Sequence, residues 1–512
     1  MATAVAQTEF GPSLDSLLNP PLPRREMRAA WVATVWNIDW PTTATAAQAT
    51  QRTQADTILN HAQTLKMNAV FLQVRSAADA MYVSGIEPWS KWLTNTMGTA
   101  PNPVWDPLSY WLAGARSRGI QLYVWLNPYR ALPTGVTAAS SHISVTRPDL
   151  MALFSGDKFF DPGKVDSRTR IRTVISDLVT RYDIDGVVFD DYFYPYPEAG
   201  ETFPDSATYS AYQAAGGTLS LANWRRNNVD TLVQEVGVDI KAIKPGVKFG
   251  IGPFGIWKPG NPSGVTGLSA YDDIYADSRK WLQLGWVDFL APQLYWKISS
   301  TGQPYSALLN WWTQQNLMSR HVYASNAAYK VADGTTSAWV TQEILDQIDV
   351  TRNTAGATGN VFYNFKVFRD NRDNLRTNLA AGQYAQPAII PSAPWIDNLA
   401  PFTPALTYTY NRTTKTHQAS WVAQGSEAAQ WYVIAACENN AWSHQVVPST
   451  TLTWSRALKL NNRALQAFAV CAVDRQGNAS SYVGKVFDAS VVTSGFGVEN
   501  AVAHPNGAVI QP

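Results

Sequence analysis

The sequence predicts an α/β protein in which a (β/α)8 TIM barrel is followed by a small all-β sandwich. Between Arg28 and Phe368, eight apolar runs of strand length alternate with amphipathic helical patterns. Continuous apolar strands separated by helices indicate parallel strands covered by helices, and eight such units in succession fit a closed barrel. After about residue 386 the pattern changes to short alternating strands without a helical stripe, which is typical of a β-sandwich.

The elements of the predicted barrel follow one another with clear boundaries. The first helix begins near Thr53, and its buried face consists of Ile58, Leu59, Ala62 and Leu65. In the second helix Asp106 is the cap, Pro107 takes the first helical position and Gly119 ends the element. The predicted strands, in order, read AAWVATV, NAVFLQV, IQLYVWL, GVVFDD, VKFGIGP, VDFLAPQLYW, HVYASNAAY and NVFYNF.

A doubly wound open sheet is the competing architecture for the same alternation of strands and helices. Such a fold carries a Gly-rich phosphate-binding loop after its first strand. Here the first strand runs directly into WNIDWP, which contains no glycine. The sequence therefore favours the barrel.

A proline-rich segment, QPAIIPSAPWIDNLAPFTP (386–404), marks the boundary between the two predicted domains. We read it as a linker followed by the first strand of a new domain. The expected organisation is an N-terminal extension (1–25), the barrel (26–385), the β-sandwich (386–490) and a disordered tail (491–512).

One stretch of the second domain, FAVCAVDRQGNAS, resembles the penultimate strand and turn of fibronectin type III domains. In that alignment Phe468, Val470 and Ala472 face the sandwich core. Cys471 then points outward, and we expect the same of Cys437. The two thiols are either unpaired or joined by a cross-strand disulfide.

Composition limits the classes of ligand. The chain has 512 residues with 40 basic and 39 acidic side chains, so nothing indicates electrostatic capture of nucleic acid or of anionic lipid. Its 21 Trp and 22 Tyr exceed what a core requires, and such rings stack on the apolar faces of sugars. None of the six His lies in a ligand-like cluster, so we expect no metal and no cofactor.

Residues at the carboxyl ends of barrel strands line the active face of this fold. The adjacent acids of GVVFDD, Asp190 and Asp191, are the predicted catalytic residues because carboxylates are scarce at the other strand ends. Amides, an arginine and aromatic rings around them suit a polyhydroxylated substrate. The predicted substrate-binding residues are Asp39, Trp40, Arg75, Asn127, Tyr192, Tyr194, Gln293, Tyr295, Trp296 and Asn364.

Two mechanisms are open for the acid pair. In the first, an Asp of the pair is nucleophile or base and a partner such as Asp39, Glu87 or Glu198 is the acid. In the second, the two Asp act together on a 2-acetamido sugar, one orienting the acetamido group and the other serving as general acid/base. Repulsion between neighbouring carboxylates raises one pKa and helps to keep a proton available near neutral pH.

Aromatic residues of the predicted loops favour an open groove and endo-type cleavage. Tyr192, Tyr194 and Tyr196 lie in a loop that Pro195 and Pro197 stiffen. Tryptophans fall in other loops of the same face, at Trp36, Trp40, Trp89, Trp257 and Trp296. Burial of these rings as loop cores is the alternative.

Long motifs over residues 26–370 resemble the glycosyl-hydrolase-like ten family of bacterial proteins. They include RAAWVATVWNIDWP, FLQVRSAADAMYVSGIEPWSKWL, DGVVFDDYFYPYP and YDDIYADSRKWLQLGWVDFLAPQLYW. The resemblance implies a barrel glycoside hydrolase, usually exported, and some members are associated with cleaving peptidoglycan glycan strands stripped of their peptides. Strand four also resembles the chitinase pattern Asp-Gly-x-x-x-Asp-x-Glu through Asp185, Gly186 and Asp190, but Tyr192 replaces the closing Glu.

We therefore expect a monomeric glycoside hydrolase that takes a polysaccharide or oligosaccharide from a bacterial cell wall or a related glycan. The alternative is a non-catalytic glycan-binding protein of the cell surface. No stretch is long and apolar enough for a transmembrane helix. The N-terminus shows no export signal, although the resemblance implies a location in the periplasm or at the cell surface.

Overall fold

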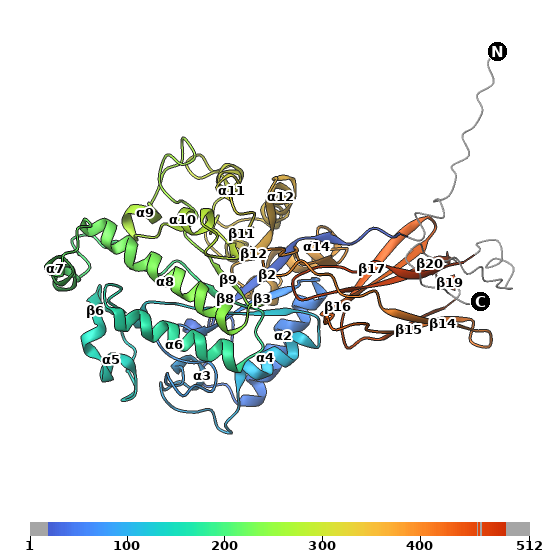
Figure 1. Ribbon diagram of the computed structural model, residues 1–512, viewed down its shortest axis with the longest axis horizontal. Coiled ribbons are helices and arrows are strands. Elements are labelled where there is room, and N and C mark those ends of the chain that lie inside the picture. Colours follow the sequence, from blue (N-terminus) through green and yellow to red (C-terminus); the bar gives the residue numbers. More distant parts are fainter. Residues whose placement is uncertain (1–18, 458, 461–462, 488–512) are drawn as a thin grey trace, which may run out of the picture. The chain divides into compact units, whose positions relative to one another are not determined.

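The computed structural model describes residues 19–457, 459–460 and 463–487. The chain divides into two compact units (Figure 1). One is Glu26–Ala385, and the other joins the described residues before Glu26 to those after Ala385. The predicted tail, 491–512, lies outside the described residues.

The first unit is a closed barrel of parallel strands in the order β10-β11-β12-β2-β3-β4-β8-β9, which confirms the predicted (β/α)8 fold. Its strands are β2 (Met27–Val32), β3 (Ala69–Arg75), β4 (Gln121–Leu126), β8 (Gly186–Phe189), β9 (Lys248–Ile251), β10 (Phe289–Leu290), β11 (His321–Asn326) and β12 (Ala357–Phe362). Each coincides with one of the eight apolar runs of the sequence, because these strands are buried on both faces.

Helices follow the strands and cover the barrel (Figure 1). The longer ones are α2 (Gln48–Thr64), α4 (Pro107–Arg116), α6 (Val165–Arg181), α8 (Leu221–Ile243), α11 (Tyr305–Gln314) and α12 (Thr341–Asn353). The shorter ones are η1 (Val35–Asn37), α3 (Lys91–Thr94), α5 (Ile143–Thr146), η2 (Pro148–Leu150), α7 (Ser206–Ala214), α9 (Ala270–Asp273), α10 (Ser278–Gln283), η3 (Ala328–Lys330), α13 (Lys366–Arg369), η4 (Arg372–Asn374) and α14 (Leu375–Ala381). A small antiparallel sheet lies between β4 and α6 in the chain and comprises β5 (Arg130–Leu132), β6 (Met151–Phe154) and β7 (Asp157–Phe160).

Local sequence explains where these helices begin. Asp106 caps α4, accepting hydrogen bonds from the backbone N–H groups of Leu108 (3.1 Å) and Ser109 (3.4 Å), and Pro107 stands at the first helical position. Helix α2 begins at Gln48, five residues before the expected start at Thr53. Those five residues are polar or small, and only Gln51 among them is buried, so they carry little of the apolar periodicity from which the start was predicted.

The barrel interior is filled by side chains from alternate positions of the strands. On β2 and just beyond it these are Ala29, Trp31 and Ala33, all of which are buried. The Trp31 ring packs edge-on against Phe71 (4.9 Å between centroids) and Trp125 (5.1 Å). Trp31 and Trp125 therefore form the aromatic floor beneath the carboxyl ends of the strands.

The second unit is all-β, in agreement with the predicted fold class. One sheet contains β14 (Ala405–Asn411), β15 (Thr416–Val422) and β18 (Thr453–Ala457). The other contains β17 (Ala441–Pro448), β16 (Trp431–Glu438), β20 (Arg463–Val473), β19 (Lys459–Leu460) and β21 (Val483–Val486). The end of the predicted N-terminal extension belongs to this unit, because β1 (Arg24–Arg25) pairs in parallel with β13 (Ala388–Ile389).

Both cysteines are free, so of the two alternatives the unpaired thiols are observed, and both side chains are buried. Cys471 does point away from the core that contains Phe468 and Val470, but it packs in a second apolar cluster with Ile389 and Ile390. The outward direction expected of Cys471 is therefore confirmed, and its thiol is buried because residues around β13 cover this face of the sheet.

Candidate active site

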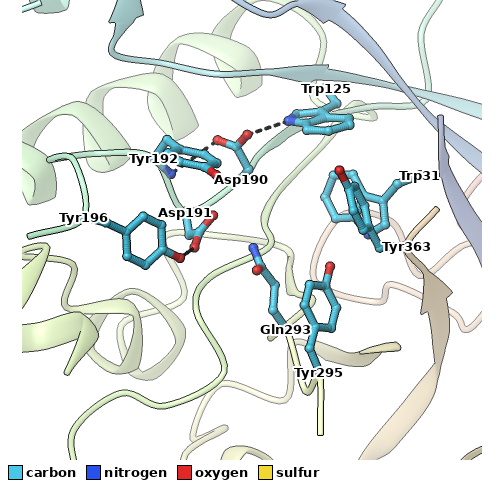
Figure 2. Close-up of a pocket in the computed structure, with 9 residues that line it drawn as sticks. All are labelled: Trp31, Trp125, Asp190, Asp191, Tyr192, Tyr196, Gln293, Tyr295 and Tyr363. Atoms are coloured by element: carbon cyan, nitrogen blue, oxygen red, sulfur yellow. Dashed lines mark hydrogen bonds between the residues drawn. The ribbon is translucent and has the colours of Figure 1, made fainter. Parts of the chain in front are cut away.

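Asp190 and Asp191 immediately follow β8, at the carboxyl end of the barrel strands. Consecutive side chains on a strand point to opposite faces of the sheet. The strand ends at Phe189, and the chain turns so that both carboxylates face the same pocket (Figure 2). Both residues are buried, with 5% and 3% of their surfaces exposed.

The pocket around this pair has a volume of about 150 Å³. A cavity of about this volume holds one six-membered ring. Its walls come from the ends of β2, β4, β8, β10 and β12. The lining residues are Trp31, Trp125, Asp190, Asp191, Tyr192, Tyr196, Gln293, Tyr295 and Tyr363 (Figure 2).

Asp190 is anchored through one of its two oxygens. Trp125 donates from Nε1 to Oδ2 of Asp190 (3.0 Å), and Asn127 donates from Nδ2 to the same oxygen. The other oxygen, Oδ1, has a long contact with the backbone N–H of Tyr192 (3.4 Å). Because an indole N–H and an amide N–H only donate, Oδ2 is kept as an acceptor. A proton on Asp190 therefore belongs on Oδ1.

A chain of amide hydrogen bonds supports this anchor. Asn127 accepts at Oδ1 from Gln73 Nε2 (2.7 Å). Gln73 in turn accepts at Oε1 from the backbone N–H groups of Thr34 (3.0 Å) and Val35 (2.9 Å), in the loop after β2. The orientation of Asp190 is thus linked to the ends of three strands.

Asp191 has different partners. The hydroxyl of Tyr196 donates to Oδ2 of Asp191 (Figure 2). Gln293 also interacts with this carboxylate, and Gln293 is itself held by a hydrogen bond from its Nε2 to the carbonyl of Gly252 (2.9 Å). The carboxylate of Asp191 is therefore stabilised in place on the opposite side of the pocket from Trp125.

Burial dominates the titration of the pair. It raises the pKa of Asp190 to about 7, and the neighbouring charge of Asp191 adds to the increase, while Trp125 and the positive charge of Arg130 oppose it. Burial also raises the pKa of Asp191, against the effects of Tyr196, Gln293 and Arg130. Near neutral pH the pair is therefore poised to hold one proton.

Of the predicted substrate-binding residues, Tyr192, Gln293 and Tyr295 line the pocket, and Asn127 donates a hydrogen bond to Asp190 without lining the pocket. Asn364 follows the lining residue Tyr363 directly but is not part of the wall. These positions combine a carboxylate pair with hydroxyl and amide groups, all of which can form hydrogen bonds with the hydroxyl groups of a ligand.

Arg75 does not reach the pocket. Its fully buried guanidinium forms a two-pronged ion pair with Glu87 (2.8 and 3.0 Å) and donates to the backbone carbonyl of Pro128 (3.2 Å). Arg75 therefore has a structural role in this ion pair, and Glu87 is engaged in the same pair.

The side chains of Asp39 and Trp40 form hydrogen bonds with backbone groups of the protein instead of lining the pocket. Asp39 accepts from the backbone N–H of Ala33 (2.7 Å) at one oxygen and from that of Lys366 (2.6 Å) at the other. Burial raises its pKa to about 7. Trp40 is fully buried and donates from Nε1 to the carbonyl of Gln51 (2.8 Å). Neither side chain lines the pocket.

Tyr194 and Trp296 also lie outside the pocket wall. Tyr194 is 1% exposed, and its ring packs edge-on against Phe203 (5.1 Å between centroids) and Tyr275 (5.2 Å). Trp296 is half-buried and packs edge-on against Phe254 (5.8 Å). Both aromatic residues serve loop packing in this structure.

Three lining residues were absent from the sequence prediction: Trp31, Trp125 and Tyr363. Each lies at or near a strand end, and a signal for one of them was present. Trp125 stands two residues before Asn127, which directly follows the same strand, so both side chains point to the same side.

Two further properties of the chain concern the binding of a metal ion and the crossing of a membrane. Within the described residues, the carboxylates close enough to share a metal ion are those of Asp397, Glu427 and Asp474, whose ligand atoms lie within 4.8 Å of one another in the all-β unit. No helix in the described part of the chain is long and apolar enough to cross a membrane.

Comparison with known proteins gives a family. Residues 26–346 match the family described as Glycosyl hydrolase-like 10. The chain is 36% identical over 394 residues to the glycosyl hydrolase YngK of Bacillus subtilis (75% of this chain, 76% of that protein). It is 37% identical over 332 residues to the glycosyl hydrolase DigH of Escherichia coli K12 (60% of this chain, 74% of that protein).

Among solved structures, the glycoside hydrolase domain of PgaB from Bordetella bronchiseptica aligns with a TM-score of 0.47 at 13% identity, over 70% of this chain and 98% of that one. The sequence matches to the family and to its curated relatives are much stronger. As its motifs predicted, the chain belongs to the Glycosyl hydrolase-like 10 family, a family of glycoside hydrolases.

Proposed function

We propose that this protein hydrolyses O-glycosidic bonds within a bacterial cell-wall glycan or a related glycan, with Asp190 and Asp191 as the catalytic residues. Peptidoglycan glycan strands without peptide stems are the first candidate substrate, and such a substrate implies a location outside the cytoplasm. The observation that carries the proposal is the pair of buried carboxylates in one ring-lined pocket, where the pKa of Asp190 is about 7. That value leaves an acid partly protonated at neutral pH.

The contacts of three other acids support one of the two mechanisms over the other. Asp39 has both oxygens engaged by backbone N–H groups, and Glu87 is paired with Arg75. Glu198 is exposed and does not line the pocket. None of the three acids considered as a distant partner is therefore placed to act on a sugar in this pocket, which favours joint action of Asp190 and Asp191.

In the proposed mechanism Asp190 is the general acid. With Oδ2 anchored by Trp125 and Asn127, Oδ1 carries the proton and donates it to the glycosidic oxygen as the bond to the anomeric carbon breaks. Asp191 remains a carboxylate and accepts the N–H of a 2-acetamido group. The acetamido oxygen attacks the anomeric carbon and forms a cyclic intermediate, the substrate-assisted variant of this chemistry.

The second step restores the enzyme. A water molecule enters where the leaving group departed, Asp190 now takes a proton from it as general base, and the water oxygen bonds to the anomeric carbon. The ring of the intermediate opens, so the acetamido group is regenerated and the configuration at the anomeric carbon is retained. Each proton given in the first step is recovered in the second.

The aromatic wall supplies binding surface for a sugar ring. The rings of Tyr295 and Tyr363 lie nearly parallel (6.0 Å between centroids, 24°), opposite the acids in Figure 2. Such rings contact the apolar C–H faces of sugars, while the two acids and Gln293 can form hydrogen bonds with the polar groups of the same sugar. Binding in the pocket thus orients one sugar residue relative to Asp190.

The test is mass spectrometry of products from purified peptidoglycan glycan strands with and without peptide stems, and from chitin oligosaccharides. We expect new reducing ends on the peptide-free strands, and fragments of intermediate length among the early products, as endo-type cleavage requires. Single sugars or disaccharides as the only early products contradict the endo assignment. Binding of all these glycans without any product supports instead a non-catalytic glycan-binding protein.

A further inference from the structure

Trp36 stands out at the active face because its ring is exposed. It lies in η1, in the loop that directly follows β2, at the same end of the barrel as Asp190. Its side chain is 57% exposed, and no other Trp or Phe in the described part of the barrel unit is as exposed. A single exposed apolar residue needs no explanation by itself. The conformation of the loop that carries Trp36, and the contacts that hold its ring, do need one.

The loop backbone is held in a costly conformation. Trp36 has φ 55° and ψ 16°, and Asn37 has φ 54°, so two consecutive non-glycine residues are left-handed. Asn37 secures this turn by donating from Nδ2 to the carbonyls of Pro41 (2.8 Å) and Trp92 (2.7 Å). Strained residues of this kind persist where the surroundings over-determine them, and they cluster at ligand sites.

The ring of Trp36 is supported from one side. It packs against Trp92, with 4.5 Å between ring centroids and 51° between the planes, and Trp92 is buried. The supported indole is therefore a fixed surface, and the remainder of it faces solvent. A preorganised ring loses little conformational entropy when a ligand stacks on it.

The same loop is connected to the catalytic acid. The backbone N–H groups of Thr34 and Val35 donate to Gln73, Gln73 donates to Asn127, and Asn127 donates to Asp190. The loop carrying Trp36 is thus held in a defined relation to the proton donor. The pocket itself has room for one ring, so further sugars of a longer substrate must leave it along the barrel rim, where this loop lies.

We propose that Trp36 is a sugar-stacking platform outside the pocket, which binds a residue of the glycan chain at a distance from the bond that is cleaved. The inference rests on the proposed glycoside hydrolase function. It adds a specific subsite, and it predicts that affinity increases with chain length because of this one ring.

The test compares Trp36→Asn with wild type on peptide-free peptidoglycan strands separated by length. Asn tolerates the left-handed backbone, so this substitution removes the ring and keeps the loop conformation. We expect KM for long strands to rise by about 3- to 10-fold, the range for one lost aromatic contact, with kcat unchanged and with the kinetics of the shortest cleaved fragment unchanged. Trp36→Tyr should recover part of the affinity.

Phe402→Ala is the matched control, because Phe402 is similarly exposed (62%) but lies in the all-β unit. It should leave every constant unchanged. Equal loss for short and long strands, or no loss at all in an enzyme that cleaves these strands, overturns the subsite. A change in sedimentation coefficient of Trp36→Asn without a change in KM overturns it too, and assigns the ring to a protein interface. If wild type cleaves none of the strands, the proposed function fails, independently of Trp36.

Discussion

Asn127 bridges Gln73 and Asp190: its Nδ2 donates to Oδ2 of Asp190, and its Oδ1 accepts from Gln73. Asn127 itself is 1% exposed and does not line the pocket. Its effect on substrate therefore passes through the orientation of the Asp190 carboxylate.

Replacing Asn127 by Ala should lower kcat by about 10- to 100-fold with little change in KM, the scale expected for a misplaced catalytic group. Gln73→Ala should act in the same direction, and the double variant should be no worse than Asn127→Ala because both act on one network. Steady-state kinetics of the three variants check this. Wild-type kcat in Asn127→Ala, or strictly additive losses, would show that the bridge does not position Asp190.

Arg130 should influence the pH range of activity. Its guanidinium lies over the Tyr192 ring (4.3 Å to the centroid), and its charge lowers the pKa of both Asp190 and Asp191. In Arg130→Met both pKa values should rise. Because activity requires protonated Asp190 and charged Asp191, both limbs of the kcat/KM profile should move to higher pH. Arg147→Met, at an exposed ion pair, should leave the profile in place. A shift of the profile to lower pH would contradict the arrangement.

Asp39 should matter for stability and not for chemistry. Its two oxygens accept from the backbone N–H groups of Ala33 and Lys366, and an amide at this position keeps only one acceptor. In Asp39→Asn the free energy of unfolding should fall by about 1–3 kcal/mol, the cost of one unsatisfied buried group. Denaturant unfolding measures the loss, and kcat of the folded enzyme should stay within about 2-fold. A large drop in kcat with unchanged stability would contradict this prediction and would indicate that Asp39 takes part in catalysis.

The barrel should function alone. Residues 26–385 form one compact unit, and β1, which precedes it, pairs with β13 in the other unit. A chain truncated to 26–385 should therefore be soluble, unfold cooperatively and retain kcat on short substrates. An insoluble or inactive product, under conditions where the full chain is active, would show that the all-β unit is needed to complete the barrel.

The sequence revealed the barrel because its signal is local. Each strand is a continuous apolar run and each helix has a periodic stripe, so eight strands could be located without tertiary information. The acid pair was found for the same reason, since Asp190 and Asp191 follow a strand directly. No information about distant residues was needed to place these two acids at the end of a strand.

The rest of the site depends on contacts between side chains that come from separate segments of the chain. Arg75 is a strand-end residue, yet its guanidinium forms an ion pair with Glu87 and does not line the pocket. No local sequence pattern predicts this ion pair. Trp40 also does not line the pocket, because its ring packs against Trp111 (5.3 Å between centroids). Conversely, Trp31 lines the pocket from inside the barrel, where sequence reasoning placed only core. Strand-end position predicts which residues are near the site, and packing decides which of them reach it.

The central claim is that Asp190 and Asp191 perform the hydrolysis, and kcat/KM of Asp190→Asn on a glycan that wild type cleaves tests it most directly. We expect a loss of at least about 100-fold, the scale of a lost acid/base group, with an unchanged melting temperature and continued binding of the glycan. Asp191→Asn should show a comparable loss, whereas Asp39→Asn should not. Rates near wild type in both variants of the pair, in folded protein, would contradict the account.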